Sequence, residues 1–429
     1  MTLLIISPDY ASHLLPLATL GSAWQRAGQR VVVATGTATA PIVESFGFER
    51  AHLQLGKGSN PGVIRAEQQP TGEDDALRGF FEATREGMIP TLAFQARARL
   101  SDLMWEPVRV GREVQAVVEE IAPDVVIVDH LAFSARLALV AAGIPHADVV
   151  VGHPSALPLG DEVYGFPPAW PRAFHPDPAA LAELRELCDR VSESFTAEWN
   201  AALAQLNPGA APSPAAFSEH GDLLLLNYPA PLADPARSLP PHVFLGSAVR
   251  AEAADVEVEG WLAESDDPFV YVSFGSFLSV RSDVLARVCD ALARLGLRAA
   301  IAFGSADRAD LGPLPDDWLV REFLPQVTLL RRASATVTHG GNNSVTEALT
   351  FGVALLVLPF STDQFAGAAA IEAGGYGLAL APNDASVADL AEALTTVLAL
   401  PRAPLDAVSA DLRQSPGSIR AFSALSPTN

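Results

Sequence analysis

A glycine- and asparagine-rich corner between an expected strand and an expected helix is the stretch best suited to chemistry. Residues 338–344 read T-H-G-G-N-N-S, and Glu347 follows. Residues 335–338 predict a short buried strand, and residues 344–351 predict a helix that ends at Gly352. Unpaired N–H groups and the positive dipole end at a helix N-terminus favour an anion. The corner therefore predicts a phosphate site, whose candidate ligands are His339, Gly340, Gly341, Asn342, Asn343 and Ser344.

A second candidate lies near the beginning of the chain, just beyond the first expected strand. Residues 3–7 predict a buried strand, 14–27 an apolar helix and 30–34 the next strand. Such a βαβ opening predicts a parallel sheet with right-handed crossovers. Ligands of open α/β sheets bind at the carboxyl ends of the strands, which is where His13 lies. Its position alone leaves two interpretations open: a catalytic histidine, or one that caps the helix or is simply exposed.

The corner and its neighbours resemble the donor-binding signature of family 1 nucleotide-sugar-dependent glycosyltransferases. The pieces that match are Leu324-Pro325-Gln326, His339-Gly340-Gly341, Asn343-Ser344, Glu347, Gly352 and Asp363-Gln364. Two positions depart from plant members, since Phe323 stands where they have a base-stacking tryptophan and Asn342 replaces another tryptophan. A glycine-rich turn used only for packing is the alternative, but it does not need this whole series. The resemblance implies a GT-B fold, with two Rossmann-like α/β domains that face each other across a cleft.

The resemblance also implies a role for each matched residue. His13-Leu14-Leu15-Pro16 matches the H-x-x-P that carries the family's catalytic histidine. Asp129, at the end of the expected strand 123–128, would then pair with His13; helix N-capping is its alternative role. Both residues follow parallel strands on one sheet edge, in agreement with such a pair. The implied donor ligands are Ser276 for the diphosphate, Phe323, Leu324, Gln326 and Glu347 for base and ribose, and Asp363 and Gln364 for the sugar.

The implied reaction is a one-step, inverting transfer of a sugar from a UDP- or TDP-sugar to an acceptor hydroxyl. The sequence contains no Asp-x-Asp, so we expect no required metal ion and no cofactor beyond the nucleotide sugar. Two rivals remain open. A nucleotide-sugar 2-epimerase of the same fold would act on the donor alone, and a non-catalytic nucleotide-sugar-binding protein would transfer nothing.

Proline-studded aromatic loops predict an apolar acceptor site above the first sheet. Residues 153–158 and 164–170 form these loops, and stiff apolar loops suit an aromatic or polyketide-type acceptor. Packing between domain surfaces is the alternative explanation. The candidate acceptor-binding residues are His153, Tyr164, Phe166, Trp170, Phe80 and Met88.

Composition narrows the possible partners. The chain has 429 residues and a formal net charge of −22, from 28 basic and 50 acidic side chains. Such an acidic surface repels nucleic acid and anionic membranes, so a diphosphate would be held by local dipoles. The sequence shows no signal-peptide pattern and no apolar run long enough to span a membrane. Cys188 and Cys289 suggest neither a disulfide framework nor a metal site. We expect a cytoplasmic monomer or homodimer.

The expected organisation is two domains joined by a linker. Residues 1–227 form the acceptor domain, and residues 228–250, which contain five prolines, form the linker. Residues 251–404 form the donor domain, and 405–429 cross back to the first domain. Within the first domain we predict a long mobile loop over 53–90 and helices over 92–121 and 177–206.

Overall fold

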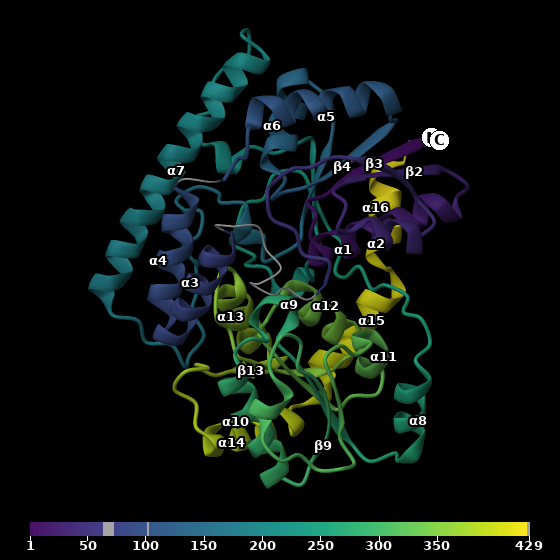
Figure 1. The fold of residues 1–429 in the computed structure, drawn as a ribbon, viewed down its shortest axis with the longest axis vertical. Coiled ribbons are helices and arrows are strands. Elements are labelled where there is room, and N and C mark those ends of the chain that lie inside the picture. The colour runs from purple at the N-terminus through teal and green to yellow at the C-terminus, as the bar shows by residue number, and fades with distance from the viewer. Residues whose placement is uncertain (63–72, 101–102, 427–429) are drawn as a thin grey trace.

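The computed structural model describes residues 1–62, 73–100 and 103–426. It consists of two α/β halves, each built on a parallel sheet (Figure 1). The first half is purple to teal in the figure, and the second is green to yellow. The two predicted Rossmann-like domains are therefore present.

The first sheet has seven strands in the order β3-β2-β1-β4-β5-β6-β7, and every neighbouring pair is parallel. Alternate residues of β1 and β2 enter two different cores, as the period-2 geometry of a strand requires. Because both faces are covered, the strands are almost continuously apolar. The strands are β1 Thr2–Ile6, β2 Arg30–Thr35, β3 Glu49–His52, β4 Val125–Asp129, β5 Ala147–Val150, β6 Leu223–Leu226 and β7 His242–Phe244.

Helices cover the two faces of this sheet. Leu14, Leu17 and Trp24 of α1 pack on one face, and α5 and α6 supply the core of the other. The helix α7 carries Phe195 and Trp199 into a third, aromatic core. The helices of this half are α1 Ala11–Arg26, α2 Ala40–Ser45, α3 Glu73–Glu86, α4 Met88–Arg99, α5 Pro107–Ile121, α6 Phe133–Ala142 and α7 Pro178–Leu206.

The second sheet has six parallel strands in the order β10-β9-β8-β11-β12-β13. One large core unites this sheet with its helices. The strands are β8 Phe269–Ser273, β9 Arg298–Ala302, β10 Leu319–Arg321, β11 Ala335–Thr338, β12 Ala354–Val357 and β13 Gly377–Ala379. The helices are α8 Val256–Glu264, α9 Gly275–Leu278, α10 Ser282–Arg294, α11 Gln326–Leu330, α12 Asn342–Thr350, α13 Gln364–Gly374 and α14 Val387–Leu398.

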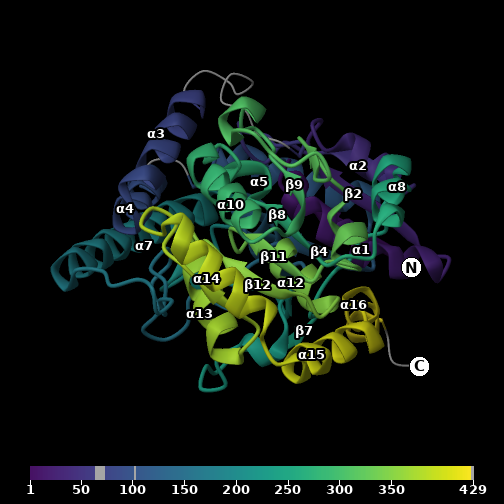
Figure 2. The ribbon, with the colours of Figure 1, turned by 90° about the horizontal axis from the view of Figure 1, so that it is seen from below.

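Of the last two helices, the first packs against α12 in the second half, and the second returns to the first half. After α15 (Arg402–Gln414), α16 (Gly417–Leu425) packs beside α1, where Phe422 meets Trp24 edge-to-face at 5.1 Å between ring centroids. Figures 1 and 2 both show α16 beside α1. The crossing ties the end of the second domain to the beginning of the first.

Three predicted segments differ from the structure. The predicted loop 53–90 contains α3 and the start of α4; residues 63–72 lie outside the described residues. The mobile-loop prediction is wrong for α3, because Leu77 and Phe81 place an apolar stripe on it at helical spacing. The predicted helix 92–121 is two helices, and Pro107 begins the second. Finally, β7 lies within the predicted linker 228–250.

Candidate active site

His13 and Asp129 form a hydrogen-bonded pair at the carboxyl edge of the first sheet. The distance between His13 Nδ1 and Asp129 Oδ2 is 2.8 Å. Asp129 ends β4, which pairs with β1, and His13 lies in the first turn of α1 directly after β1. The Leu131 N–H donates to the other Asp129 oxygen at 2.8 Å. The carboxylate is therefore fixed on both sides, and it in turn orients the imidazole.

The two groups change each other's proton affinity. Burial lowers the pKa of His13, but the Asp129 carboxylate, the hydrogen bond to it and the more distant Asp363 raise it, and the net result is above the ordinary value. Burial likewise works against the Asp129 carboxylate, but His13 outweighs it and holds the Asp129 pKa below its usual range. Such a pair is typical of a general base that is oriented by a carboxylate. Asp129 is fully buried, whereas the His13 side chain keeps 19% of its surface.

A cavity of about 900 Å³ lies in front of His13. Its wall comes from both halves of the protein. His13 and His130 line it from the first half, and the corner around His339 lines it from the second. Of the six candidate ligands in the corner over residues 339–344, all except Gly340 line the cavity.

The corner itself has the predicted strand-to-helix form. β11 ends at Thr338, and α12 begins at Asn342. Gly340 has φ +87°, a value that favours glycine. The Val345 N–H bonds the Gly341 carbonyl at 3.0 Å, so the N–H groups of residues 342–344 precede the helical ladder. This geometry suits an anion.

The His339 ring is enclosed by glycines. A Cβ at Gly341 would lie 2.4 Å from His339 Nε2, and one at Gly275 would lie 2.8 Å from the ring. Burial lowers the pKa of His339 to about 4, although Asp363 and the Ser273 backbone counteract it. The imidazole is therefore neutral at pH 7, and one ring N–H is still able to donate to an oxygen.

The Asn342 and Asn343 side chains bond the second domain to the first. Asn342 exchanges two hydrogen bonds of 2.8 Å with Asn227 at the end of the first domain's sheet. The Asn343 amide donates to the Ser12 carbonyl at 3.0 Å, beside His13. Their side chains therefore contact the other domain, and their backbone N–H groups lie at the corner.

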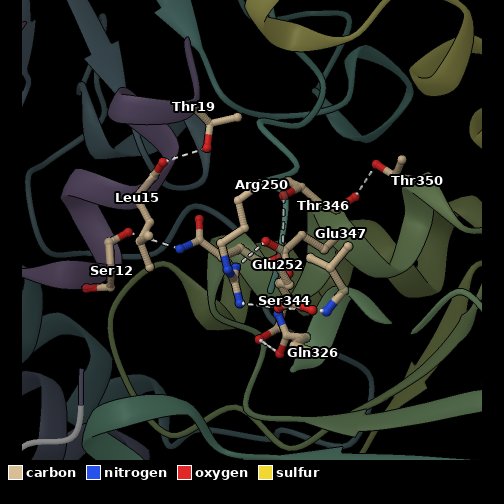
Figure 3. A network of polar contacts seen from close by, with 12 residues as sticks. Ser12, Leu15, Thr19, Arg250, Glu252, Gln326, Ser344, Thr346, Glu347 and Thr350 are labelled. Carbon is tan, nitrogen blue, oxygen red and sulfur yellow. Dashed lines mark hydrogen bonds and ion pairs between the residues drawn. The ribbon is translucent and has the colours of Figure 1, made fainter. Parts of the chain in front are cut away.

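Glu347 belongs to a buried polar network (Figure 3). The Arg250 guanidinium donates to Glu347 at 2.7 Å, and Gln326 donates to the other Glu347 oxygen at 2.6 Å. Glu252 accepts from Arg250 at 2.9 Å, and Ser344 donates to Gln326 at 3.3 Å. Burial raises the pKa of Glu347, although Arg250 and Gln326 counteract it. Gln326, Ser344 and Arg250 line the cavity, whereas Glu347 stands behind them.

Two predicted base-binding residues lie at the cavity wall. Phe323 is 60% exposed, and its ring has no aromatic partner among the described residues. Leu324 is buried, but it also lines the cavity. An exposed aromatic face beside a buried leucine suits a stacked base.

Asp363 and Gln364 lie at the start of α13 and line the cavity too. Asp363 accepts a hydrogen bond from the His153 N–H at 2.6 Å, so it also bridges the two halves. The side-chain oxygen Oε1 of Gln364 accepts hydrogen bonds from the N–H groups of Phe360 and Ser361. Thr362, just before them, has φ +53°, a strained value for a β-branched residue.

The predicted acceptor residues divide into two groups. Tyr164, Phe166 and Phe80 line the cavity. His153, Trp170 and Met88 do not: the His153 ring packs edge-to-face on Tyr228, Trp170 packs on Phe365, and Met88 lines a smaller cavity of about 270 Å³. Ser276 belongs to α9, and its side chain lies outside the described part of the structure.

Sequence reasoning missed several cavity-lining residues, among them His130 and Arg250. His130 follows Asp129, and its Nδ1 lies 3.7 Å from the Asp129 carboxylate and 3.2 Å from the Val149 carbonyl. Burial lowers its pKa, although Asp129 counteracts this. Arg250 was counted as part of the linker. An opposite charge two positions later, on Glu252, was the one sign of an ion pair in the sequence. The fold brings Arg250 to Glu347 as well.

The second half is clearly related to known proteins. The profile of the family described as "UDP-glucoronosyl and UDP-glucosyl transferase" matches residues 183–402, slightly more than half of the chain. Two Bacillus subtilis proteins called uncharacterized UDP-glucosyltransferases, YdhE and YojK, are 32% and 26% identical. Those alignments span 28% and 37% of this chain, and the chain covers only 31% and 39% of their length.

Other relatives align over almost the whole chain. The 4'-demethylrebeccamycin synthase of Lentzea aerocolonigenes is 26% identical over 91% of this chain and 90% of its own. The L-demethylnoviosyl transferase of Streptomyces niveus is 27% identical over 90% and 86%. Among solved structures, the calicheamicin glycosyltransferase CalG4 superposes with a TM-score of 0.68 at 20% identity, covering 99% of this chain and 97% of its own.

No helix in the described parts of the chain is long and apolar enough to cross a membrane. The neighbours of the fold are GT-B glycosyltransferases. The family match, the two facing parallel sheets and the cavity between them agree with one another. The chain belongs to the family of UDP-glucuronosyl and UDP-glucosyl transferases.

Proposed function

We propose that this protein transfers a sugar from a UDP- or TDP-sugar to a hydroxyl group of a small aromatic or polyketide-type acceptor, with inversion at the anomeric carbon. One observation carries the proposal. His13, bonded to Asp129 at 2.8 Å, lines the same cavity as the anion-binding corner of the second domain. A base and a diphosphate site that face one cavity are what a one-step transfer between two substrates needs.

His13 acts as the general base. Because Nδ1 is bonded to Asp129, Nε2 is the nitrogen available to the acceptor. Nε2 takes the proton of the acceptor hydroxyl while the acceptor oxygen bonds to the anomeric carbon and the bond from that carbon to the diphosphate oxygen breaks. Asp129 keeps the required tautomer and stabilises the imidazolium that forms.

The corner of the second domain stabilises the departing nucleoside diphosphate. Negative charge grows on the leaving phosphate oxygen during the transfer. The backbone at the start of α12 and the neutral His339 ring supply donors from a fixed geometry, so little reorganisation is needed. Phe323 stacks on the base, and Asp363 and Gln364 bind sugar hydroxyls.

The names of relatives guide the choice of substrates. One similar structure is described as the spinosyn rhamnosyltransferase SpnG complexed with thymidine diphosphate, and another as SpnG complexed with spinosyn aglycone. The apolar wall formed by Phe80, Tyr164 and Phe166 supports an acceptor of similar character. Both UDP and TDP donors are compatible with the corner.

The proposal also states that no metal ion is required, because the sequence lacks Asp-x-Asp. The test is a thermal-shift screen of UDP, TDP, GDP and ADP, followed by mass spectrometry of reactions with the matching sugar donors and a pool of phenolic and polyketide acceptors. We expect UDP or TDP to stabilise the protein and a glycosylated product to form equally well with EDTA. Donor epimerisation without acceptor, or activity lost in EDTA and restored by Mg²⁺, would contradict the proposal.

A further inference from the structure

The acceptor side of the cavity contains one cation that the proposed transfer does not use. Among the residues that the structure describes, two arginines line the cavity, Arg99 and Arg250. Arg250 is neutralised by Glu347 and Glu252. Arg99, in contrast, has neither a hydrogen bond nor an ion pair with any of the described residues.

The guanidinium of Arg99 is nevertheless held in place. It lies over the Tyr164 ring, 4.9 Å from the centroid, and Tyr164 itself is buried and stacked on Phe217 at 3.9 Å. Gly165 has φ +84°, and a Cβ there would lie 2.8 Å from Arg99 Nη1. A guanidinium stacked on an aromatic ring leaves its in-plane N–H donors free for a carboxylate.

A second polar group without a partner lies one helical turn away. Gln95 also lines the cavity, and its side-chain oxygen is buried without a hydrogen-bond partner in the described parts of the chain. Residues four apart on a helix are neighbours on one face, so α4 presents Gln95 and Arg99 together. Buried acceptors are almost always bonded, so this oxygen is a place for a donor on a ligand.

Apolar side chains line the same cavity, among them Phe80, Phe94 and Phe166. A few polar groups in an otherwise apolar pocket fix the orientation of a ligand. We infer that the acceptor is an aromatic carboxylic acid, whose carboxylate is bound by Arg99 and whose neighbouring hydroxyl or N–H group donates to Gln95. This inference rests on the proposed function and names the class of its acceptor.

Matched pairs of probes test the inference without any sugar transfer. Isothermal titration calorimetry would measure the Kd of a hydroxynaphthoic acid and its carboxamide, and of a dihydroxyanthraquinone carboxylic acid and its carboxamide. A hydrogen-bonded charge pair predicts that the acids bind roughly ten- to hundredfold more tightly than the amides. Equal binding of acid and amide, or failure of both acids to bind, would overturn the inference.

Variants of α4 locate the effect. Arg99→Met should abolish the preference for the acid. Arg99→Lys keeps a cation at this position and should keep part of the preference, so it tests the role of the charge even where Arg99→Met folds poorly. Gln95→Glu would place an internal carboxylate beside Arg99, so it should weaken the acids roughly tenfold and leave the amides unchanged. Arg97→Met removes an exposed cation from the same helix and should change nothing.

Persistence of the acid preference in Arg99→Met would refute the role of Arg99. Product formation is measured separately with the sugar donor that the thermal-shift screen selects. Transfer to acceptors without any acid preference would contradict this inference alone. Acid preference without transfer to any acceptor would contradict the proposed function instead.

Discussion

At the scale of single residues, the central feature is the pair formed by His13 and Asp129. Burial alone would make the imidazole a weaker base, but the carboxylate 2.8 Å away reverses that effect. A raised pKa strengthens the base, at the cost of a lower neutral fraction near neutral pH. The pair therefore links the activity directly to pH.

The first prediction follows from the sign of this pKa shift. The neutral imidazole is the active form, so kcat/KM should rise with pH through an apparent pKa above 6.5, the ordinary value for histidine. Asp129→Asn removes the carboxylate, so the rise of kcat/KM should move to lower pH. Turnover should also fall by roughly 10²–10⁴-fold. Steady-state kinetics from pH 5 to 9 measures both. If kcat/KM of the variant rises at the same pH as that of the wild type, Asp129 does not act on His13.

The resemblance to the family predicted this pair, and the apolar strands before both residues agreed with it. It did not reveal Arg250, which reaches Glu347 across 97 positions of sequence. Nor did it reveal Arg99, since its setting depends on Tyr164 and Gly165 from another segment. Contacts between distant segments depend on packing, which no local pattern of residues encodes.

At the scale of elements, the corner between β11 and α12 combines a buried strand with an open helix start. His339 fits between Gly275 and Gly341 only because neither residue has a Cβ. Gly341 has φ −63°, so its backbone conformation is open to any residue and the space beside it is the constraint. Its absent side chain therefore determines where the His339 ring lies.

The second prediction tests this constraint with two alanines. Gly341→Ala should displace His339 and weaken the binding of UDP or TDP roughly tenfold, which corresponds to about 1.4 kcal/mol. Gly367→Ala, in α13, has nothing within 4 Å of the added Cβ and should leave affinity unchanged. Calorimetric titration of both variants with the nucleoside diphosphate gives the comparison. Unchanged affinity in Gly341→Ala would show that the position of the His339 ring does not affect diphosphate binding.

Helices and strands with a regular apolar pattern were predictable. Elements whose apolar residues stand among polar residues, glycines or prolines were not. The buried strands and α7 matched their predicted positions within one or two residues. The polar N-terminal residues of α3 concealed its apolar stripe, because glycines and acidic residues around it suggested a loop. β7 is three residues long among prolines, and its pairing with β6 alone makes it a strand.

At the scale of the whole molecule, the two domains meet through polar contacts around the cavity. Asn227 bonds Asn342, Ser12 bonds Asn343, and His153 bonds Asp363. Farther away, Arg281 and Asn383 donate to the Thr84 carbonyl at the end of α3. A change of charge at this interface therefore affects the stability of the protein.

The third prediction concerns acid. Burial lowers the pKa of His153 to about 4, with Asp363 counteracting and Arg237 contributing. The unfolded chain then binds the proton more readily, so stability is lost as pH falls from about 6.5 towards 4. His153→Asn keeps an acceptor for the Ser155 N–H but does not titrate. Between pH 7 and 5, the free energy of unfolding in urea should fall by about 2 kcal/mol more in the wild type than in the variant. Parallel profiles would contradict the assignment.

The most direct test of the whole account is the separation of binding from turnover in His13→Ala. This change removes the base but leaves the corner of the second domain intact. Titration calorimetry should give a Kd for UDP or TDP within about threefold of the wild type. Turnover with the sugar donor and acceptor should fall by roughly 10²–10⁴-fold. Near-wild-type turnover in this variant would contradict the claim that His13 takes the acceptor's proton.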